Sequence, residues 1–527
     1  MNQPLDLAIT LTPPPGGSPP EVIASTALRS DPQGLTYSGD LLTEPLTQRE
    51  REEFRWYLEE YWQWPYEQFA QRGKQVESLL VEFGKRLYKT VFGSLGARDI
   101  LQAWRLQPDA QRQISIISKV PKVLSLPWEL LHDEQGFLVL RTRHPVSIVR
   151  RLPQSELAAL PTPFDPPLRI LLVTARPEGA GFMDPRSTAQ GLLDEVQGQI
   201  DAGTVTLEFL RPPTRSALRT RLKDAKRPVH VLHFDGHGTF DGEINKQDGL
   251  RRSGGEQGNL AFEDDQGKLD LVKAEDVAQI LLDSGVRLAV LDACQSAMGA
   301  SDDAFSSVAT RLIQGGIDSV VAMSASVLVA SSTLFFEAFY REMAAGIPAS
   351  TAQERARQAL YDDPRRHMLR RRRDEEGQPV ELRDWWLPHF YQQRPLELRP
   401  TRPSGELKQE LAPSSDRLSE SMPAEPRYGF SGRAYELLQI ERFLLHGQLV
   451  VMHGFGGVGK TALVRETADW LTRTRMYGAA SFVSFEHGGD AATLLSALGT
   501  FLGVYDGHYN PNETKAALAK LEPALKQ

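Results

Sequence analysis

The sequence has little of several features that mark secreted or membrane-bound proteins. One cysteine occurs among 527 residues, so an internal disulfide cannot form and a secreted disulfide scaffold is excluded. The first ten residues lack the basic region of a signal peptide, so we expect a reducing, cytoplasmic compartment. Basic residues are not in excess, because 60 lysines and arginines stand against 68 acidic residues and the net charge is −8. This balance gives no reason to expect a nucleic-acid partner.

Long uncharged segments are scarce as well. The most conspicuous one runs from Ser319 to Phe336, but it is rich in serine and alanine and is flanked by Asp318 and Glu337. We interpret it as a buried strand that leads into a buried helix, so no membrane partner is expected. With 41% hydrophobic and 24% charged residues, the composition is that of a globular protein.

The pattern along the chain predicts two folded regions joined by a linker. Proline and glycine are dense in residues 12–20, which indicates irregular structure there. Residues 400–426 are rich in proline, serine and charge, as linkers are. The predicted division is an irregular lead-in at 1–44, a first domain at 45–399 (helical and hairpin part 45–160, α/β core 165–395), a linker at 400–426 and a second α/β unit at 427–527.

Within the first domain, short apolar runs alternate with helical patterns. Two helices are expected within 48–92, a hairpin at 133–140 and a strand at 146–150. Further strands are predicted at 168–175, 205–210, 229–234, 286–291 and 318–323. Such alternation is typical of a parallel sheet, so the predicted fold class is α/β, a mostly parallel sheet flanked by helices. The basic run 365–373 is interpreted as a solvated loop or helix face.

Two loops at strand ends carry residues suited to nucleophilic catalysis. One strand ends in HFDGHG (233–238) and the next ends in LDACQS (291–296). Sites in open α/β sheets lie at the carboxyl ends of strands, so His237 and Cys294 face one crevice if the strands are neighbours. A nearby imidazole can activate a thiol or transfer its proton to a leaving amine. The N–H groups of Gly238 and Cys294 can then form an oxyanion hole.

The two loops together resemble the CHAT family of caspase-like cysteine proteases. The motif LPWELL at 126–131, followed by the strand at 146–150, also looks like the amino-terminal part of that family. The resemblance spans about residues 45–395 and implies a caspase-type fold that hydrolyses peptide bonds in a protein substrate. The roles that it implies are nucleophile for Cys294, general acid/base for His237 and oxyanion contributor for Gly238.

Two charged residues are candidates for contact with the P1 side chain of the substrate. Asp292 lies two residues before Cys294, where the related metacaspases place an aspartate against a basic P1 residue. This resemblance suggests Arg or Lys before the cut. Alternatively, Asp292 caps the following turn or pairs with Arg176, and Arg176 favours an acidic P1 residue as in animal caspases. Nearby His233 is interpreted as a hydrogen-bonded core residue and not as a zinc ligand, because the glycines beside it favour a turn.

A second motif fits phosphate binding. The apolar run 449–453 predicts a strand, and GFGGVGKT at 454–461 matches G-x-x-x-x-G-K-[ST] before a helix that begins at Ala462. The glycines let backbone N–H groups wrap the phosphates of ATP or ADP. Lys460 reaches the outer phosphates and the Thr461 hydroxyl binds Mg²⁺. The predicted nucleotide contacts in this loop are Gly454, Gly456, Gly457, Val458, Gly459, Lys460, Thr461 and Ala462.

The surroundings of this loop resemble the STAND class of signalling ATPases, the NB-ARC and NACHT relatives. The resemblance rests on FSGR at 430–433, a predicted helix at 434–445 and the phosphate loop. It places Gly432 and Arg433 near the adenine. A second strand is predicted at 481–485, with helices at 491–502 and 514–521. No apolar strand ending in aspartate follows, so we expect an amino-terminal piece of a longer protein, which puts ATP hydrolysis by this chain in question.

Together the resemblances imply an effector protease controlled by a nucleotide switch. They suggest ADP-to-ATP exchange, self-oligomerisation on activation and a sensor region beyond this chain. For a bacterial protein they suggest antiphage defence or regulated cell death, with a gasdermin-type protein as a candidate substrate. One alternative is a catalytically silent caspase-like module that binds proteins and oligomerises with ATP. The other is a phosphate-loop regulator whose first domain binds nucleotide or nucleic acid through the basic run 365–373.

Overall fold

A computed structural model describes most of the chain. The described residues are 5–14, 22–28, 36–42, 46–107, 111–141, 146–153, 167–240, 258–292, 304–325, 327–369, 378–393, 396, 418–419, 421–427, 429–447, 449–504 and 514–525. The chain divides into two compact units, Met1–Leu411 and Ala412–Gln527. The boundary between them lies inside the segment 400–426, which the sequence predicts as a linker.

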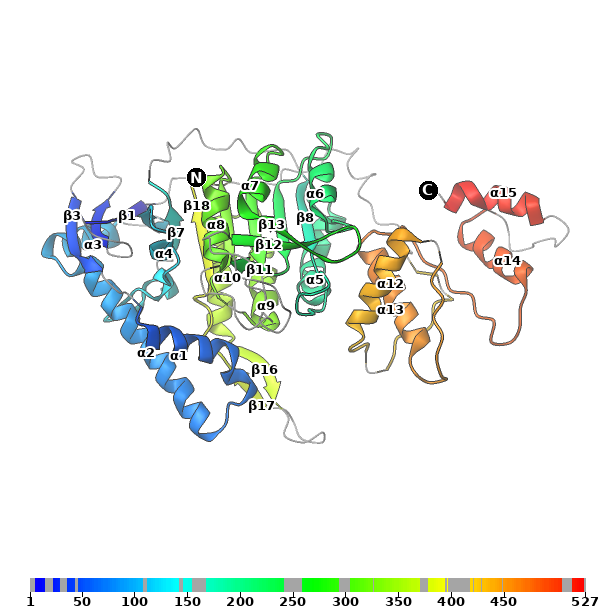
Figure 1. Ribbon diagram of the computed structural model, residues 1–527, viewed down its shortest axis with the longest axis horizontal. Helices are drawn as coiled ribbons and strands as arrows, with labels where there is room; N and C mark the ends of the chain where they lie inside the picture. Colours follow the sequence, from blue (N-terminus) through cyan, green and yellow to red (C-terminus); the bar gives the residue numbers. More distant parts are fainter. Residues whose placement is uncertain are drawn as a thin grey trace. The chain divides into compact units, whose positions relative to one another are not determined.

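The first unit is built on a sheet of eleven strands. Their order across the sheet is β3-β2-β1-β4-β7-β18-β15-β14-β10-β8-β9 (Figure 1). In chain order the strands are β1 (Leu5–Thr12), β2 (Val22–Leu28), β3 (Thr36–Leu42), β4 (Arg112–Ser118), β7 (Val146–Arg151), β8 (Leu168–Thr174), β9 (Val205–Phe209), β10 (Val231–Asp235), β14 (Leu288–Asp292), β15 (Ser319–Met323) and β18 (Pro388–Gln392). Every residue of β10, β14 and β15 is buried, so both faces of the sheet are covered there.

The strands run in two blocks of opposite direction. β9, β8, β10, β14 and β15 are parallel, and β18, β7, β4 and β1 are parallel to one another. The blocks meet where β15 pairs antiparallel with β18, with Met323 opposite Pro388. The predicted mostly parallel sheet is thus confirmed, as are the predicted strands of the core. The carboxyl ends of β8, β10, β14 and β15 share one edge, which we call the site edge.

The amino-terminal lead-in is not irregular, which corrects the prediction for residues 1–44. β1 pairs parallel with β4 and antiparallel with β2, and β3 pairs with β2. Leu7, Ile9 and Leu11 alternate along β1 and are buried. This alternation is the pattern of a strand with one buried face, and the proline-rich segment begins only where β1 ends.

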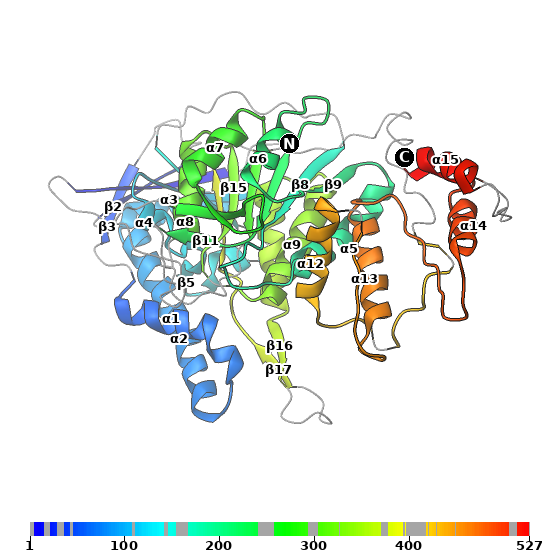
Figure 2. The ribbon, with the colours of Figure 1, turned by 45° about the vertical axis from the view of Figure 1, so that its right-hand side comes forward.

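Helices pack in two groups around this sheet. α5 (Ser187–Asp201), α9 (Val329–Ala344) and α10 (Ala349–Asp362) lie side by side, and α7 (Ala274–Leu282) packs on α8 (Ala304–Gln314) (Figures 1 and 2). The uncharged segment 319–336 forms β15 and the start of α9, as predicted. No helix in the described parts of the chain has the length and apolar character required to cross a bilayer. The remaining helices of this unit are α1 (Gln48–Glu59), α2 (Glu67–Phe92), α3 (Leu95–Leu106), α4 (Pro121–Leu124) and α6 (Arg215–Leu222).

Three small sheets complete the unit. β11 (Gly238–Phe240), β12 (Gly258–Glu263) and β13 (Leu269–Lys273) form one of them. The predicted hairpin is β5 (His132–Asp133) with β6 (Gly136–Phe137), although Leu138–Leu140 forms a 3-10 helix and not a strand. The basic run begins in a strand and not in a loop or helix, because β16 (Arg365–Leu369) pairs with β17 (Gln378–Glu381).

The LPWELL motif supplies a buried carboxylate that joins this motif to β7 and α10. Glu129 accepts hydrogen bonds of 2.7 Å from both Nη1 and Nη2 of Arg150 in β7. Nη2 of Arg357 in α10 lies 3.3 Å away, and none of the three side chains is exposed. Burial raises the pKa of Glu129, but the charges of Arg150, His389 and Arg357 and the hydrogen bonds from Arg150 together outweigh burial, and the pKa is about 2. Glu129 is therefore a buried anion held by two cations.

The described part of the second unit is helical. Its helices are α12 (Ala434–His446), α13 (Lys460–Arg473), α14 (Ala491–Phe501) and α15 (Thr514–Leu525), close to the predicted ranges. The strands predicted at 449–453 and 481–485 are absent from the described residues. Leu449 and Val451 are 82% and 76% exposed. A strand needs a neighbour to pair its backbone groups, and the one bridge recorded in this unit joins Leu418 to Ala480.

Candidate active site

Two neighbouring parallel strands, β10 and β14, carry the predicted catalytic residues to the site edge. Asp235 ends β10 and lies directly opposite Asp292, which ends β14. His237 and Cys294 each follow these aspartates by two residues. Neighbouring strands are about 4.8 Å apart and two residues span at most about 7 Å, so the chain positions of His237 and Cys294 allow the two side chains to meet. The strands are neighbours as expected, while Cys294 itself lies outside the described residues.

His237 is buried and one of its ring nitrogens is engaged. Nε2 lies 2.7 Å from the carbonyl oxygen of Gly181. A carbonyl can only accept, so Nε2 carries the proton and Nδ1 is the basic nitrogen. Burial lowers the pKa of His237; the bond to Gly181 opposes this and the charge of Arg176 adds to it. The ring is therefore neutral at neutral pH, the form that can take a proton from a thiol.

The Gly181 carbonyl belongs to the loop that follows β8, a strand paired with β10 at the same edge. It fixes which nitrogen of His237 is basic and is therefore part of the site. No pattern in the sequence singles out Gly181, because a backbone carbonyl has no residue-type signature. The signal available was its place after a predicted strand whose end meets the site edge.

Gly238 presents its N–H away from its partner strand. It opens β11, where it lies opposite Leu260, and the N–H of Ala261 donates to the carbonyl of His237. In an antiparallel pair this pattern makes Gly238 and Leu260 a non-hydrogen-bonded pair. The N–H of Gly238 therefore points toward the side of β11 that carries no further strand among the described residues. This orientation suits the predicted oxyanion role.

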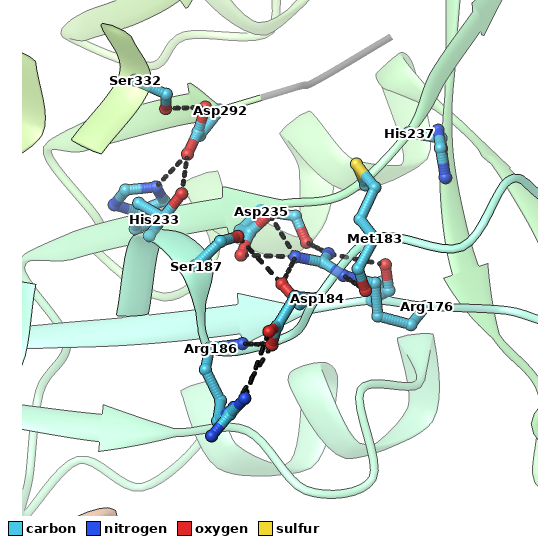
Figure 3. A network of polar contacts seen from close by, with 12 residues as sticks. Arg176, Met183, Asp184, Arg186, Ser187, His233, Asp235, His237, Asp292 and Ser332 are labelled. Atoms are coloured by element: carbon cyan, nitrogen blue, oxygen red, sulfur yellow. Dashed lines mark hydrogen bonds and ion pairs between the residues drawn. The ribbon is translucent and has the colours of Figure 1, made fainter. Parts of the chain in front are cut away.

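Arg176 is occupied within the fold, contrary to the prediction that it contacts the P1 residue. Its Nη2 donates to Oδ1 and Oδ2 of Asp235 at 2.7 and 2.8 Å (Figure 3). Nη1 donates to the carbonyl of Asp235 and Nε to that of Met183. The side chain is 1% exposed. Burial and the nearby Asp292 raise the pKa of Asp235, and Arg176 opposes this rise. Arg176 holds the end of β10 in place.

Asp292 is likewise buried and its hydrogen bonds are made inside the fold, while its predicted contact with a basic P1 residue stays a prediction. Its Oδ2 accepts a 2.8 Å hydrogen bond from Thr188 in α5, and its Oδ1 accepts one from Ser332 in α9 (Figure 3). Nε2 of His233 lies 3.8 Å from Oδ2, and the aspartate is 0% exposed. Asp292 thus anchors the end of β14 to two helices, two residues before Cys294. The sequence motif shows that Asp292 precedes Cys294, but it does not show that α5 and α9 cover its carboxylate.

His233 is a core residue, as predicted. It lies on β10 with no exposed surface, and its Nδ1 is 3.1 Å from the hydroxyl of Tyr340 in α9. Its ring stacks on that of Tyr340 with the centroids 5.7 Å apart. Across the described ranges, no group of three or more His, Cys, Asp or Glu side chains is placed to hold a metal ion.

The phosphate-binding motif of the second unit has the backbone that its glycines predict. Gly457 and Gly459 have φ values of 78° and 87°, which favour glycine, and Gly459 is the N-cap of α13. Nζ of Lys460 lies 2.9 Å from the carbonyls of both Gly454 and Phe455. The loop therefore curls around the lysine and leads into a helix amino terminus. This backbone has the shape that a nucleotide phosphate requires, while Mg²⁺ binding by Thr461 stays a prediction.

Arg433 approaches the phosphate loop from the start of α12. Its Nη2 donates a 2.6 Å hydrogen bond to the carbonyl of Val458. Its φ of 55° is unusual for a residue with a side chain, and Gly432 before it has a φ of 77°. Arg433 therefore contacts the phosphate loop, and the place near the adenine predicted for Gly432 and Arg433 stays a prediction.

Comparison with known proteins identifies the first unit. No curated protein matches the chain. A solved structure, that of the Saccharomyces cerevisiae separase–securin complex, matches with a TM-score of 0.39 and 12% identity; the match covers 75% of this chain and 30% of that chain. The chain thus spans less than a third of the length of that separase structure. The family described as the CHAT domain matches residues 81–413, which is more than half of the 527 residues. The protein therefore belongs to the CHAT domain family, whose fold is caspase-like.

Proposed function

We propose that the first unit is a cysteine endopeptidase in which Cys294 is the nucleophile and His237 the general acid and base. The observation that carries the proposal is the register of β10 and β14, which pairs Asp235 with Asp292 and sends His237 and Cys294 off the same edge. The CHAT family match supports the same chemistry.

The geometry suggests how the proton moves. Nδ1 of His237 takes the thiol proton of Cys294 as sulfur attacks the carbonyl carbon of the scissile peptide bond. The oxyanion that forms is met by the N–H groups of Gly238 and Cys294. The imidazolium then gives its proton to the leaving amine and the C–N bond breaks, which leaves a thioester on Cys294. Water, deprotonated by the same Nδ1, hydrolyses the thioester and restores the thiol.

Cleavage of a library of proteome-derived peptides, read by mass spectrometry, tests this proposal. Cys294→Ala should abolish cleavage, and His237→Ala should slow it about 10²- to 10⁴-fold, the usual contribution of a general acid and base. Cys294→Ala should still fold, because this substitution removes only a sulfur. Cleavage that persists in Cys294→Ala would reject the assignment. A protein that binds partners but cleaves no peptide would favour the catalytically silent binding module.

We further propose that the second unit binds ATP or ADP with Mg²⁺. The support is the curled loop at 454–459, with Lys460 inside it and Arg433 against it. ATP and ADP differ by the γ-phosphate, so the bound nucleotide would define two states of a switch. Lys460→Ala should weaken binding of a fluorescent ATP analogue at least tenfold, whereas Lys520→Ala, an exposed lysine in α15, should not. Equal affinity in the two variants would reject the site.

Control of the protease by this nucleotide site, as in STAND proteins, is the proposed link between the two units. Self-oligomerisation, a sensor region, a role in antiphage defence or cell death and a gasdermin-type substrate remain predictions from the resemblance alone. Measuring Cys294-dependent cleavage with ADP and with ATP tests the link, because an unaltered rate with either nucleotide contradicts it.

A further inference from the structure

A pocket beside the site edge is not used by the chemistry proposed above. Its cavity volume is about 60 Å³. One wall is formed by Ser324 and Ala325, which directly follow β15. The facing wall is formed by Phe54 and Leu58 of α1, with Trp386 between. These three side chains are buried, and the rings of Phe54 and Trp386 are 6.0 Å apart, so the lining is apolar and well packed.

The pocket lies within reach of a peptide held at Cys294. β14 and β15 are paired, with Leu291 opposite Ala322, so Asp292 lies opposite Met323 and Ser324 comes next. Cys294 follows Asp292 by two residues. Strands are about 4.8 Å apart and rise about 3.3 Å per residue, so the wall at Ser324 is only a few residues of extended peptide from the nucleophile.

Two arginines and one glutamate are among the residues that line the pocket. Arg55 is paired with Glu59 at 2.9 Å, which leaves those two side chains neutral as a pair. Arg51 also lines the pocket, and no ion pair to it occurs among the described residues. In addition, Oγ of Ser324 is buried and has no hydrogen-bond partner in the described part of the structure. Among the described residues, Arg51 is thus a lining cation without an ion-pair partner, which can attract an acidic group.

We propose that this pocket is a substrate subsite that takes an aliphatic or aromatic side chain close to the scissile bond, with an acidic residue next to it facing Arg51. The proposal rests on the peptidase function proposed above. Phe54, Leu58 and Trp386 give the pocket an apolar surface that favours an aliphatic or aromatic side chain, because apolar groups gain free energy when they leave water. Arg51 then selects the neighbouring residue by charge.

The test uses the full chain and the peptide library described above. Wild-type cleavage products should be enriched in an apolar residue with an adjacent Asp or Glu, at one fixed distance from the cut. Arg51→Glu should lower kcat/KM for such a peptide about tenfold and raise it for the same peptide with Lys in place of the acid. Arg49→Glu, an exposed arginine on the same helix, is the matched control and should change neither value. Ala325→Leu narrows the pocket and should shift the preference toward smaller apolar residues.

The outcomes separate the subsite from the peptidase itself. Cleavage that depends on Cys294 but shows no apolar preference, or equal effects of Arg51→Glu and Arg49→Glu, overturns the subsite and leaves the peptidase standing. No cleavage of any peptide that depends on Cys294 overturns both. A preference that follows the charge at position 51 establishes the subsite.

Discussion

Replacing Asp292 distinguishes an anchor of the sheet edge from a substrate contact. The carboxylate is fully buried, and it accepts hydrogen bonds from Thr188 in α5 and Ser332 in α9. Asp292→Ala removes the acceptor and leaves two buried hydroxyl groups without their partner. Asp292→Asn keeps one carbonyl oxygen and the shape of the side chain.

The size of the effect follows from these contacts. A buried donor left unsatisfied costs about 1–3 kcal/mol, so two of them lower the free energy of unfolding by about 2–6 kcal/mol in Asp292→Ala. Asp292→Asn should lose about 1–2 kcal/mol, because each hydroxyl can rotate toward the amide. Asp265→Asn, an exposed residue in the turn between β12 and β13, is the control and should stay within about 0.5 kcal/mol of wild type.

Urea unfolding followed by tryptophan fluorescence measures this loss. The method reports mainly on the first unit, because only Trp470 of the 8 tryptophans follows residue 411. Residual peptidase activity of Asp292→Asn should fall by the same factor for every P1 residue. If the variant is as stable as wild type and loses cleavage only after Arg or Lys, Asp292 reads the substrate and the anchoring role is wrong.

Two further predictions concern groups buried in the first unit. Burial, with the added charge of Arg176, lowers the pKa of His237 below its ordinary 6.5. The acid limb of kcat/KM against pH should therefore have its midpoint below pH 6.5. A midpoint at or above pH 6.5 would contradict the lowered pKa of His237. Glu129→Gln should lower the free energy of unfolding by about 3–5 kcal/mol, since Arg150 and Arg357 lose their anion. The contribution of ionised Glu129 to stability should be present above about pH 4.5 and be lost as pH falls toward its folded pKa of about 2, which acid titration of the wild type checks.

The core strands could be predicted because covered parallel strands are short, continuous apolar runs. β10, β14 and β15 all have this pattern, and their order along the chain implied the shared edge. β1 differs from the predicted irregular lead-in, although Leu7, Ile9 and Leu11 alternate along it as in a strand. Its pattern is half polar, and the prolines that follow dominated the interpretation of the segment. Alternation over eight residues was the better guide, since β1 ends where the prolines begin.

Side-chain roles at the site were harder to predict than the strands. His237 could be chosen from its residue type and its place after a strand. The role of Asp292 depends on Thr188 and Ser332, which lie 104 and 40 residues away in the chain, so no local pattern could reveal it. The strand expected at 449–453 shows the same limit, because an apolar run becomes a strand only when a neighbour pairs with it.

The two aspartates that end β10 and β14 face each other, and like charges so close would repel. Each carboxylate is stabilised by its own partners: the guanidinium of Arg176 donates to Asp235, and the hydroxyl groups of Thr188 and Ser332 donate to Asp292. Both carboxylates thereby fix the strand ends. Among the described residues at this edge, the imidazole of His237 and the N–H of Gly238 are the groups to which the proposal gives a catalytic role. In the proposed reaction the imidazole transfers the proton of the thiol, and backbone N–H groups bind the oxyanion. A thiol nucleophile requires both functions.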